Sequence, residues 1–312
     1  MKDQFLKLQL LLLLLLVAFS SCTPSRSMLN SGKVLPKNQV RFGENYTFNI
    51  SSAPIAQSIK GSVALSNDLS QSDTIYYDEQ IKNINSALIA YCLDPIGSTN
   101  DFYFRYGLGH HLDLGYKNSG GANAFDIQYQ FLGSNKTFNE SEYKGMYGSI
   151  GAQYAWQNYR FLKIYKFDKM QQLFGLEMSR QEISVPVIFS KPFGPEERVG
   201  CLSFGIVYSH SFIKYKLEPK KIYELDPSAH ISPELLAPVD AKRNFSTYGT
   251  FINLKIGKKF IFFNVSLAAY YQNYGSYPLL GGEKINLQGV SIVPSYGIQF
   301  NILPKKKKEG NF

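Results

Sequence analysis

The chain has 312 residues and a formal charge of +9 at pH 7, so it is long enough for one large domain or two small ones. The positive charge is scattered, and its only dense run, Lys305–Lys308, is typical of a solvated tail, which argues against nucleic-acid binding. No zinc-ligand spacing, glycine-rich phosphate loop or paired-carboxylate signature is present, so we predict neither a metal nor a cofactor.

The first 22 residues predict export. Lys2 and Lys7 precede an apolar run from Leu8 to Phe19, which is too short to span a membrane and is typical of a signal peptide. The run ends in Ser20-Ser21-Cys22, which resembles the lipobox of bacterial lipoproteins, although Phe19 stands where that family usually has Leu. The resemblance implies cleavage after residue 21 and an acyl lipid, such as palmitate, on Cys22. An ordinary signal peptide with an incidental cysteine is the alternative.

The mature chain predicts a membrane β-barrel. It has 22 Tyr and 23 Phe against one Trp, and such aromatic residues form girdles at both interfaces of membrane barrels. Apolar residues alternate with Gly, Ser, Asn and Gln over long segments such as Val290–Ile302, which suits a lipid-facing side and a polar lumen. We predict an all-β, transmembrane, antiparallel up-and-down barrel with about ten strands (8–12): 39–51, 101–108, 110–118, 123–132, 145–156, 181–190, 198–215, 243–257, 259–272 and 289–302.

The connections between these strands alternate between long and short. Short periplasmic turns and long extracellular loops are typical of outer-membrane barrels. With an even strand count, both termini are then expected in the periplasm. We therefore predict a periplasmic tether at 22–38, the barrel at 39–303 and a basic periplasmic tail at 304–312.

The segment Arg105–Gly115, followed by Asp126–Gly133, resembles a hairpin that recurs in outer-membrane barrel proteins of Gram-negative bacteria. The lipobox ahead of a barrel rich in Tyr and Asn resembles the uncharacterised barrel lipoproteins of the Bacteroidota group. These resemblances imply a fold and a location in the cell outer membrane, and they bring no functional residues. In the long loop 52–100, the near-helical spacing of apolar residues in 77–93 predicts a short helix that caps or plugs the barrel mouth.

Six charged residues are predicted to line the lumen. One interpretation is a salt-bridge network that closes the lumen, because a barrel of about ten strands is filled by its side chains and buried charges require partners. The other is a narrow selective pore. Glu44 falls on the apolar face of its strand, which suggests a register error or a bulge. The six residues are Arg41, Arg105, Asp113, Lys117, Asp126 and Lys255.

A His beside a Ser can act as a general base, and His210-Ser211 is the best such pair in the chain. The alternation places His210 on the lipid-facing side, so we predict no enzymatic activity. The sequence leaves open whether Cys92 and Cys201 form a disulfide or remain two free thiols.

The sequence therefore predicts a non-enzymatic barrel lipoprotein that is a structural or accessory component of an envelope transport, secretion or assembly complex. The expected partners are the lipid bilayer and other outer-membrane or periplasmic proteins. A narrow small-solute channel is the first alternative, and a lipid-modifying hydrolase is the second.

Overall fold

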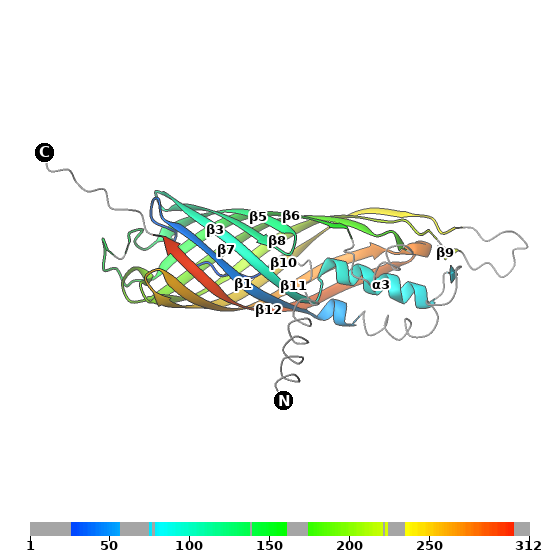
Figure 1. Ribbon diagram of the computed structural model, residues 1–312. Coiled ribbons are helices and arrows are strands. Elements are labelled where there is room, and N and C mark those ends of the chain that lie inside the picture. The colour runs from blue at the N-terminus through cyan, green and yellow to red at the C-terminus, as the bar shows by residue number, and fades with distance from the viewer. Residues whose placement is uncertain are drawn as a thin grey trace, which may run out of the picture.

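The computed structural model describes residues 26–56, 75–76, 79–137, 139–160, 174–220, 222–223 and 235–302. Within them, ten strands close into an antiparallel up-and-down barrel, which confirms the predicted fold (Figure 1). The predicted signal peptide, Cys22 and the basic tail lie outside the described residues. The barrel strands are β1 (Val40–Ser51), β3 (Gly97–Gly109), β4 (Leu112–Ser119), β5 (Ala122–Leu132), β6 (Tyr147–Arg160), β7 (Glu177–Phe193), β8 (Gly200–Leu217), β10 (Val239–Lys258), β11 (Ile261–Pro278) and β12 (Lys284–Ile302).

The period-two alternation decides which side chains face out. On β11, Phe263 is 51% exposed on the outer face, whereas the next residue, Asn264, is fully buried on the inner face. The same pattern continues on the neighbouring strands, so the outer face is apolar and the inner face carries polar side chains. Successive side chains of a strand point to opposite faces, so this sequence pattern fixes the register of the sheet.

The two ends of the barrel differ. At one end, called the short-turn end, strands β3 and β4 are joined at His110–His111, and strands β10 and β11 at Lys259–Phe260. Both histidines have positive φ (53° and 62°), as a two-residue hairpin turn requires. The first residue of β1 and the last of β12 pair at this end. At the other end, called the long-loop end, lie the connections 52–96 and 218–238.

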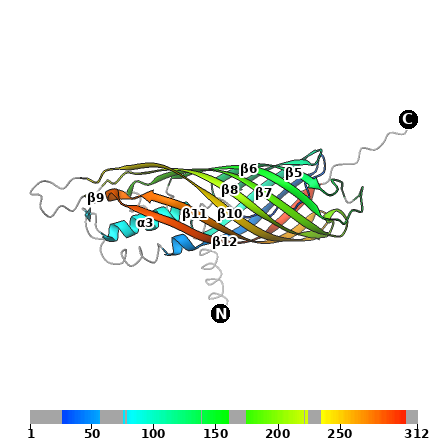
Figure 2. The same cartoon turned by 180° about the vertical axis from the view of Figure 1, so that it is seen from behind.

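The long-loop end is filled by α3 (Glu79–Leu93), which runs along the barrel beside β11 and β12 (Figures 1 and 2). Its Ile84, Leu88 and Ile89 pack in one buried cluster with inward side chains of the extended strands, among them Tyr215 and Tyr277. The helix occupies most of the segment in which the sequence predicted one. No helix among the described residues is long and apolar enough to cross a membrane. A separate two-stranded parallel sheet joins β2 (Ile75–Tyr76) to β9 (Ile222–Tyr223).

Glu44 needs neither of the explanations suggested by the sequence. Strand β1 pairs without a shift from Val40 to Thr47 on both sides, and Glu44 lies between Ile298 and Phe102. Its side chain is exposed on the outer face, as the alternation requires. The predicted bulge or register error is therefore wrong at this position.

Cys92 and Cys201 are both buried and both free. The first lies in α3 near the long-loop end, and the second is the second residue of β8, at the short-turn end. Because they lie at opposite ends of the barrel, they are too far apart to form a disulfide.

Candidate functional site

The lumen of the barrel is occupied by the chain's own N-terminal segment. Residues 26–38, which the sequence predicted as a periplasmic tether, instead lie inside the barrel, and most of them are buried. Inward polar side chains form hydrogen bonds to the backbone of this segment along its length, among them Ser266 Oγ to Met28 O (3.1 Å), Asn253 Nδ2 to Leu29 O (3.0 Å), Val34 N to Gln130 Oε1 (3.0 Å) and Leu35 N to Asp113 Oδ2 (2.9 Å). We call residues 26–38 the lumen segment.

We call the side of the long-loop end upper and the side of the short-turn end lower. Asp94 holds the upper end of the lumen segment. It follows α3, and its fully buried carboxylate forms an ion pair with Arg26 (Nη1 to Oδ1, 3.1 Å). The same carboxylate accepts hydrogen bonds from Asn49 (2.8 Å), Gln272 (2.9 Å) and Tyr274 (2.8 Å), and also from Ser291. Burial alone raises the pKa of Asp94, but the charge of Arg26 and these hydrogen bonds outweigh it and lower the pKa to about 2. Asp94 therefore joins the lumen segment, α3 and three strands.

A second buried group ties α3 to the wall of the barrel. Arg180 of β7 forms an ion pair with Glu182 and donates a hydrogen bond to the carbonyl of Leu93 (3.2 Å) at the end of α3. Ser211 of β8 donates to Glu182 (2.7 Å). Because a buried charge is costly unless it is paired and hydrogen-bonded, this arrangement fixes the position of the helix end.

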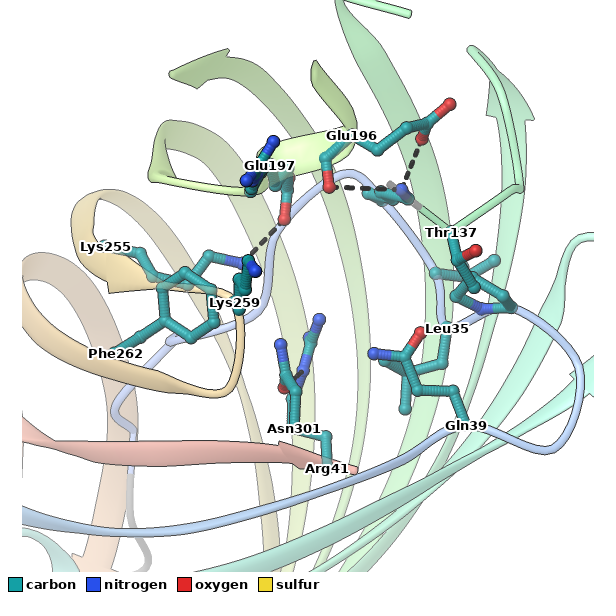
Figure 3. A pocket seen from close by; sticks show the side chains of 14 residues that line it. Leu35, Gln39, Arg41, Thr137, Glu196, Glu197, Lys255, Lys259, Phe262 and Asn301 are labelled. Atoms are coloured by element: carbon teal, nitrogen blue, oxygen red, sulfur yellow. Dashed lines mark hydrogen bonds and ion pairs between the residues drawn. The ribbon is translucent and has the colours of Figure 1, made fainter. Parts of the chain in front are cut away.

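The lower end of the lumen segment is held at the loop between β7 and β8. Lys33 forms an ion pair with Glu196, which also accepts a hydrogen bond from Tyr147 (2.9 Å). Lys255 of β10, the strand next to β8, forms an ion pair with Glu197 (2.6 Å) (Figure 3). Burial raises the pKa of Glu197, but the charge and hydrogen bond of Lys255 outweigh it and lower the pKa below its usual value.

A small cavity remains beside these residues. Its volume is about 30 Å³, and its lining includes Lys33, Arg41, Glu197 and Lys255 (Figure 3). A cavity of this size holds about two water molecules. It is far smaller than the pockets of several hundred Å³ that hold organic ligands.

All six charged residues predicted for the lumen lie on the inner face, but they form separate groups. Arg105 pairs with both Asp113 and Asp126, so the structure brings these three together. Lys255 pairs with Glu197, as described above. Lys117 donates to the carbonyl of Ser27 in the lumen segment (3.1 Å), and Arg41 donates to Asn301 (3.2 Å). Cys22, the predicted lipidation site, lies outside the described residues.

Several important residues were missed by the sequence analysis. Glu182 lies within the predicted strand 181–190 and shares the inward parity of Ser184, and Arg180 lies one residue before that strand with the same parity, so the alternation identifies both. Asp94 lies between a helix and a strand, and Glu196 and Glu197 lie in a loop. No periodic pattern marks these three acids as lumen groups.

His210 faces outward, as the alternation predicts, and its neighbour Ser211 faces inward. The Nδ1 atom of His210 lies 3.1 Å from the hydroxyl of Ser246 on β10, and its ring contacts the ring of Phe212 edge-on. Ser211 belongs to the group around Glu182. The predicted His–Ser pair is therefore separated by the sheet. Among the described residues, no cluster of three or more His, Cys, Asp or Glu side chains is placed to hold a metal ion.

No protein-family model and no curated protein sequence matches the chain. Among solved structures, the chain is similar to Ail, the attachment invasion locus protein of Yersinia pestis (7% identity, 85% of this chain and 99% of that chain, TM-score 0.31). It is also similar to the outer membrane protein OprG of Pseudomonas aeruginosa (8% identity, 88% and 100% covered, TM-score 0.31). A third similar structure is Neisserial surface protein A (7% identity, 84% and 96% covered, TM-score 0.28).

Proposed function

We propose that the chain is a lipid-anchored outer-membrane β-barrel whose lumen is closed at rest, and that it serves as a non-enzymatic structural or accessory component of an envelope transport, secretion or assembly complex. The filled lumen carries this proposal. The lumen segment and α3 occupy the interior, and buried ion pairs fix both to the wall.

The outer face supports insertion in a membrane. On β11 the outward residues from Ile261 to Tyr271 are apolar or aromatic, and the next outward residue is Asn273. Ten residues at about 3.3 Å each, tilted by about 40°, rise by about 25 Å along the barrel axis. This height equals the apolar band of about 25 Å on outer-membrane barrels. The length of the connections supports an extracellular long-loop end and a periplasmic short-turn end.

Two observations favour an accessory role over the alternatives. The lumen segment occupies the interior and the cavity beside it measures only about 30 Å³, which argues against a resting channel. His210 lies on the outer face beside Ser246, whereas the predicted partner Ser211 faces the lumen, which argues against the hydrolase. The lipobox-like Ser20-Ser21-Cys22 supports the lipid anchor and the proposed kinship with Bacteroidota barrel lipoproteins.

Two experiments separate these functions. In planar bilayers, the full-length protein is expected to give no single-channel steps at moderate voltage, whereas discrete steps of constant size support the channel. In native membranes solubilised with mild detergent, the protein is expected to migrate in a complex larger than a monomer, with the same partners recovered after cross-linking in cells. A silent protein that is always recovered alone contradicts the accessory role.

A further inference from the structure

The lumen segment has a definite direction. At its lower end, the amide of Asn38 donates to the carbonyl of Gly107 (2.8 Å), close to the turn at His110–His111. At its upper end, the carbonyl of Arg26 accepts a hydrogen bond from Tyr270. The lumen segment therefore runs from Arg26, on the side of the long-loop end, to the short-turn end, where β1 begins.

The height of Arg26 along the barrel axis can be compared with that of the apolar belt, which on β11 consists of the outward residues from Ile261 to Tyr271. Its partner Tyr270 is followed on β11 by Tyr271, which is the last apolar outward residue before Asn273. Arg26 thus lies at the upper edge of the belt, about 25 Å from the lower edge. Three residues lie between Cys22 and Arg26, and the four steps from one Cα atom to the other span at most about 14 Å. Cys22 can therefore reach the upper edge of the belt but not the lower one.

The wall of the barrel is incomplete on one side at this level. Strand β1 pairs with β12 only as far as Ser51 and Ser291, whereas β12 continues to Lys284. Among the described residues, no strand pairs with that remaining edge of β12. The chain after Ser51 covers part of it, since Ser52 bonds to the amide of Val290, and α3 lies alongside (Figures 1 and 2). A chain leaving the lumen at Arg26 meets no hydrogen-bonded sheet on this side.

We propose that the mature N-terminus emerges at the long-loop end and that the acyl chains on Cys22 enter the external leaflet of the outer membrane. This inference rests on the proposed lipidation and membrane orientation, and it replaces the predicted periplasmic N-terminus. The two ends of the mature chain then lie on opposite faces, because β12 ends at the short-turn end. The lipid and the barrel anchor the same molecule from the cell surface, and the lumen segment links them.

The test uses the full-length protein in the outer membrane of intact cells. A short epitope is inserted between Pro24 and Ser25, with matched epitopes after Ser72 and after Phe312. We expect the Pro24 and Ser72 epitopes to be labelled on intact cells, and the Phe312 epitope only after permeabilisation. Because an epitope is bulky, Ser25→Cys with a membrane-impermeant maleimide gives a second readout, in a chain in which Cys92 and Cys201 are replaced by Ala.

Mass spectrometry of the mature N-terminus separates the two proposals. A lipidated and surface-labelled N-terminus supports both. A lipidated N-terminus that is labelled only after permeabilisation overturns the inference and leaves the proposed lipoprotein intact. A surface-labelled N-terminus without lipid overturns the proposed lipidation, and with it the assignment of the leaflet.

Discussion

Substitution of Asp94 by Asn removes the counter-charge at the upper end of the lumen segment. The Asp94 carboxylate is fully buried, and the side chain of its partner Arg26 is 5% exposed. Loss of one partner from a buried ion pair costs about 3–5 kcal/mol, because the other charge stays buried without compensation. The new amide group also directs a donor toward Tyr274 or Gln272, which are donors themselves. We expect Asp94→Asn to lower the free energy of unfolding by about 3–5 kcal/mol.

The matched control is the exposed ion pair between Lys82 and Glu283, whose side chains are 38% and 46% exposed. A solvent-exposed ion pair contributes little to stability, because water screens the charges. Glu283→Gln makes the same change from carboxylate to amide and should therefore cost much less than Asp94→Asn. The difference between the two variants measures burial rather than the chemistry of the substitution.

Urea unfolding in lipid vesicles, followed by Trp156 fluorescence, measures both variants, and the heat-modified gel shift gives an independent readout. Adding Arg26→Met to Asp94→Asn should restore part of the lost stability, because it removes the unpaired buried charge. The stability changes of substitutions at two residues in contact are not additive. Equal costs for Asp94→Asn and Glu283→Gln, or a strictly additive double variant, would refute a buried Arg26–Asp94 pair.

The pKa of Asp94 is lowered from 3.8 to about 2, so the stabilisation by its ionised carboxylate is complete above pH 3.8 and is lost as the pH falls toward 2. The loss of about 2 kcal/mol should appear in acid unfolding of the wild type and be absent from Asp94→Asn. Leu267→Arg, near the middle of the apolar belt of β11, should cost about 2–4 kcal/mol in vesicle unfolding, whereas Asn273→Arg, beyond the belt on the same strand, should cost about 0–1 kcal/mol; equal costs contradict the proposed belt. His210→Ala should leave hydrolysis of lipid esters by the purified protein at background, and an activity lost with His210 supports the hydrolase instead.

The barrel strands were predictable because each strand has an apolar outer face and a polar face toward the lumen. Phe263 and Asn264 are adjacent, and the alternation alone assigns them to opposite faces. The same rule assigns Glu44 to the outer face, where its charge made the alternation look broken. The predicted strands stop several residues before the upper ends of the observed strands. Beyond Tyr271, β11 carries the outward polar residue Asn273, and the apolar pattern that marks a strand in a membrane stops.

The lumen segment was not predictable from periodicity. Its residues are held by single hydrogen bonds to strands far away in the sequence, such as Ser266 to Met28 and Asn253 to Leu29. Asp94 has the same character, since its partners come from the lumen segment and from three strands. Their local sequence shows only that they are polar or small. Which of them meet in the lumen is fixed by the closure of the barrel.

Occupation of the lumen by the chain's own N-terminus is tested most directly by a cross-link. Met28→Cys combined with Ser266→Cys puts one thiol in the lumen segment and one on the inner face of β11, at residues joined by the hydrogen bond from the Ser266 hydroxyl to the Met28 backbone carbonyl (3.1 Å). The control combines Met28→Cys with Thr250→Cys, because Thr250 is exposed on the outer face of β10. Both pairs are made with Cys92 and Cys201 replaced by Ala. After mild oxidation in native membranes, peptide mass spectrometry should find residue 28 joined to residue 266 and not to residue 250. Absence of the first link, or equal yield of both, contradicts a lumen filled by residues 26–38.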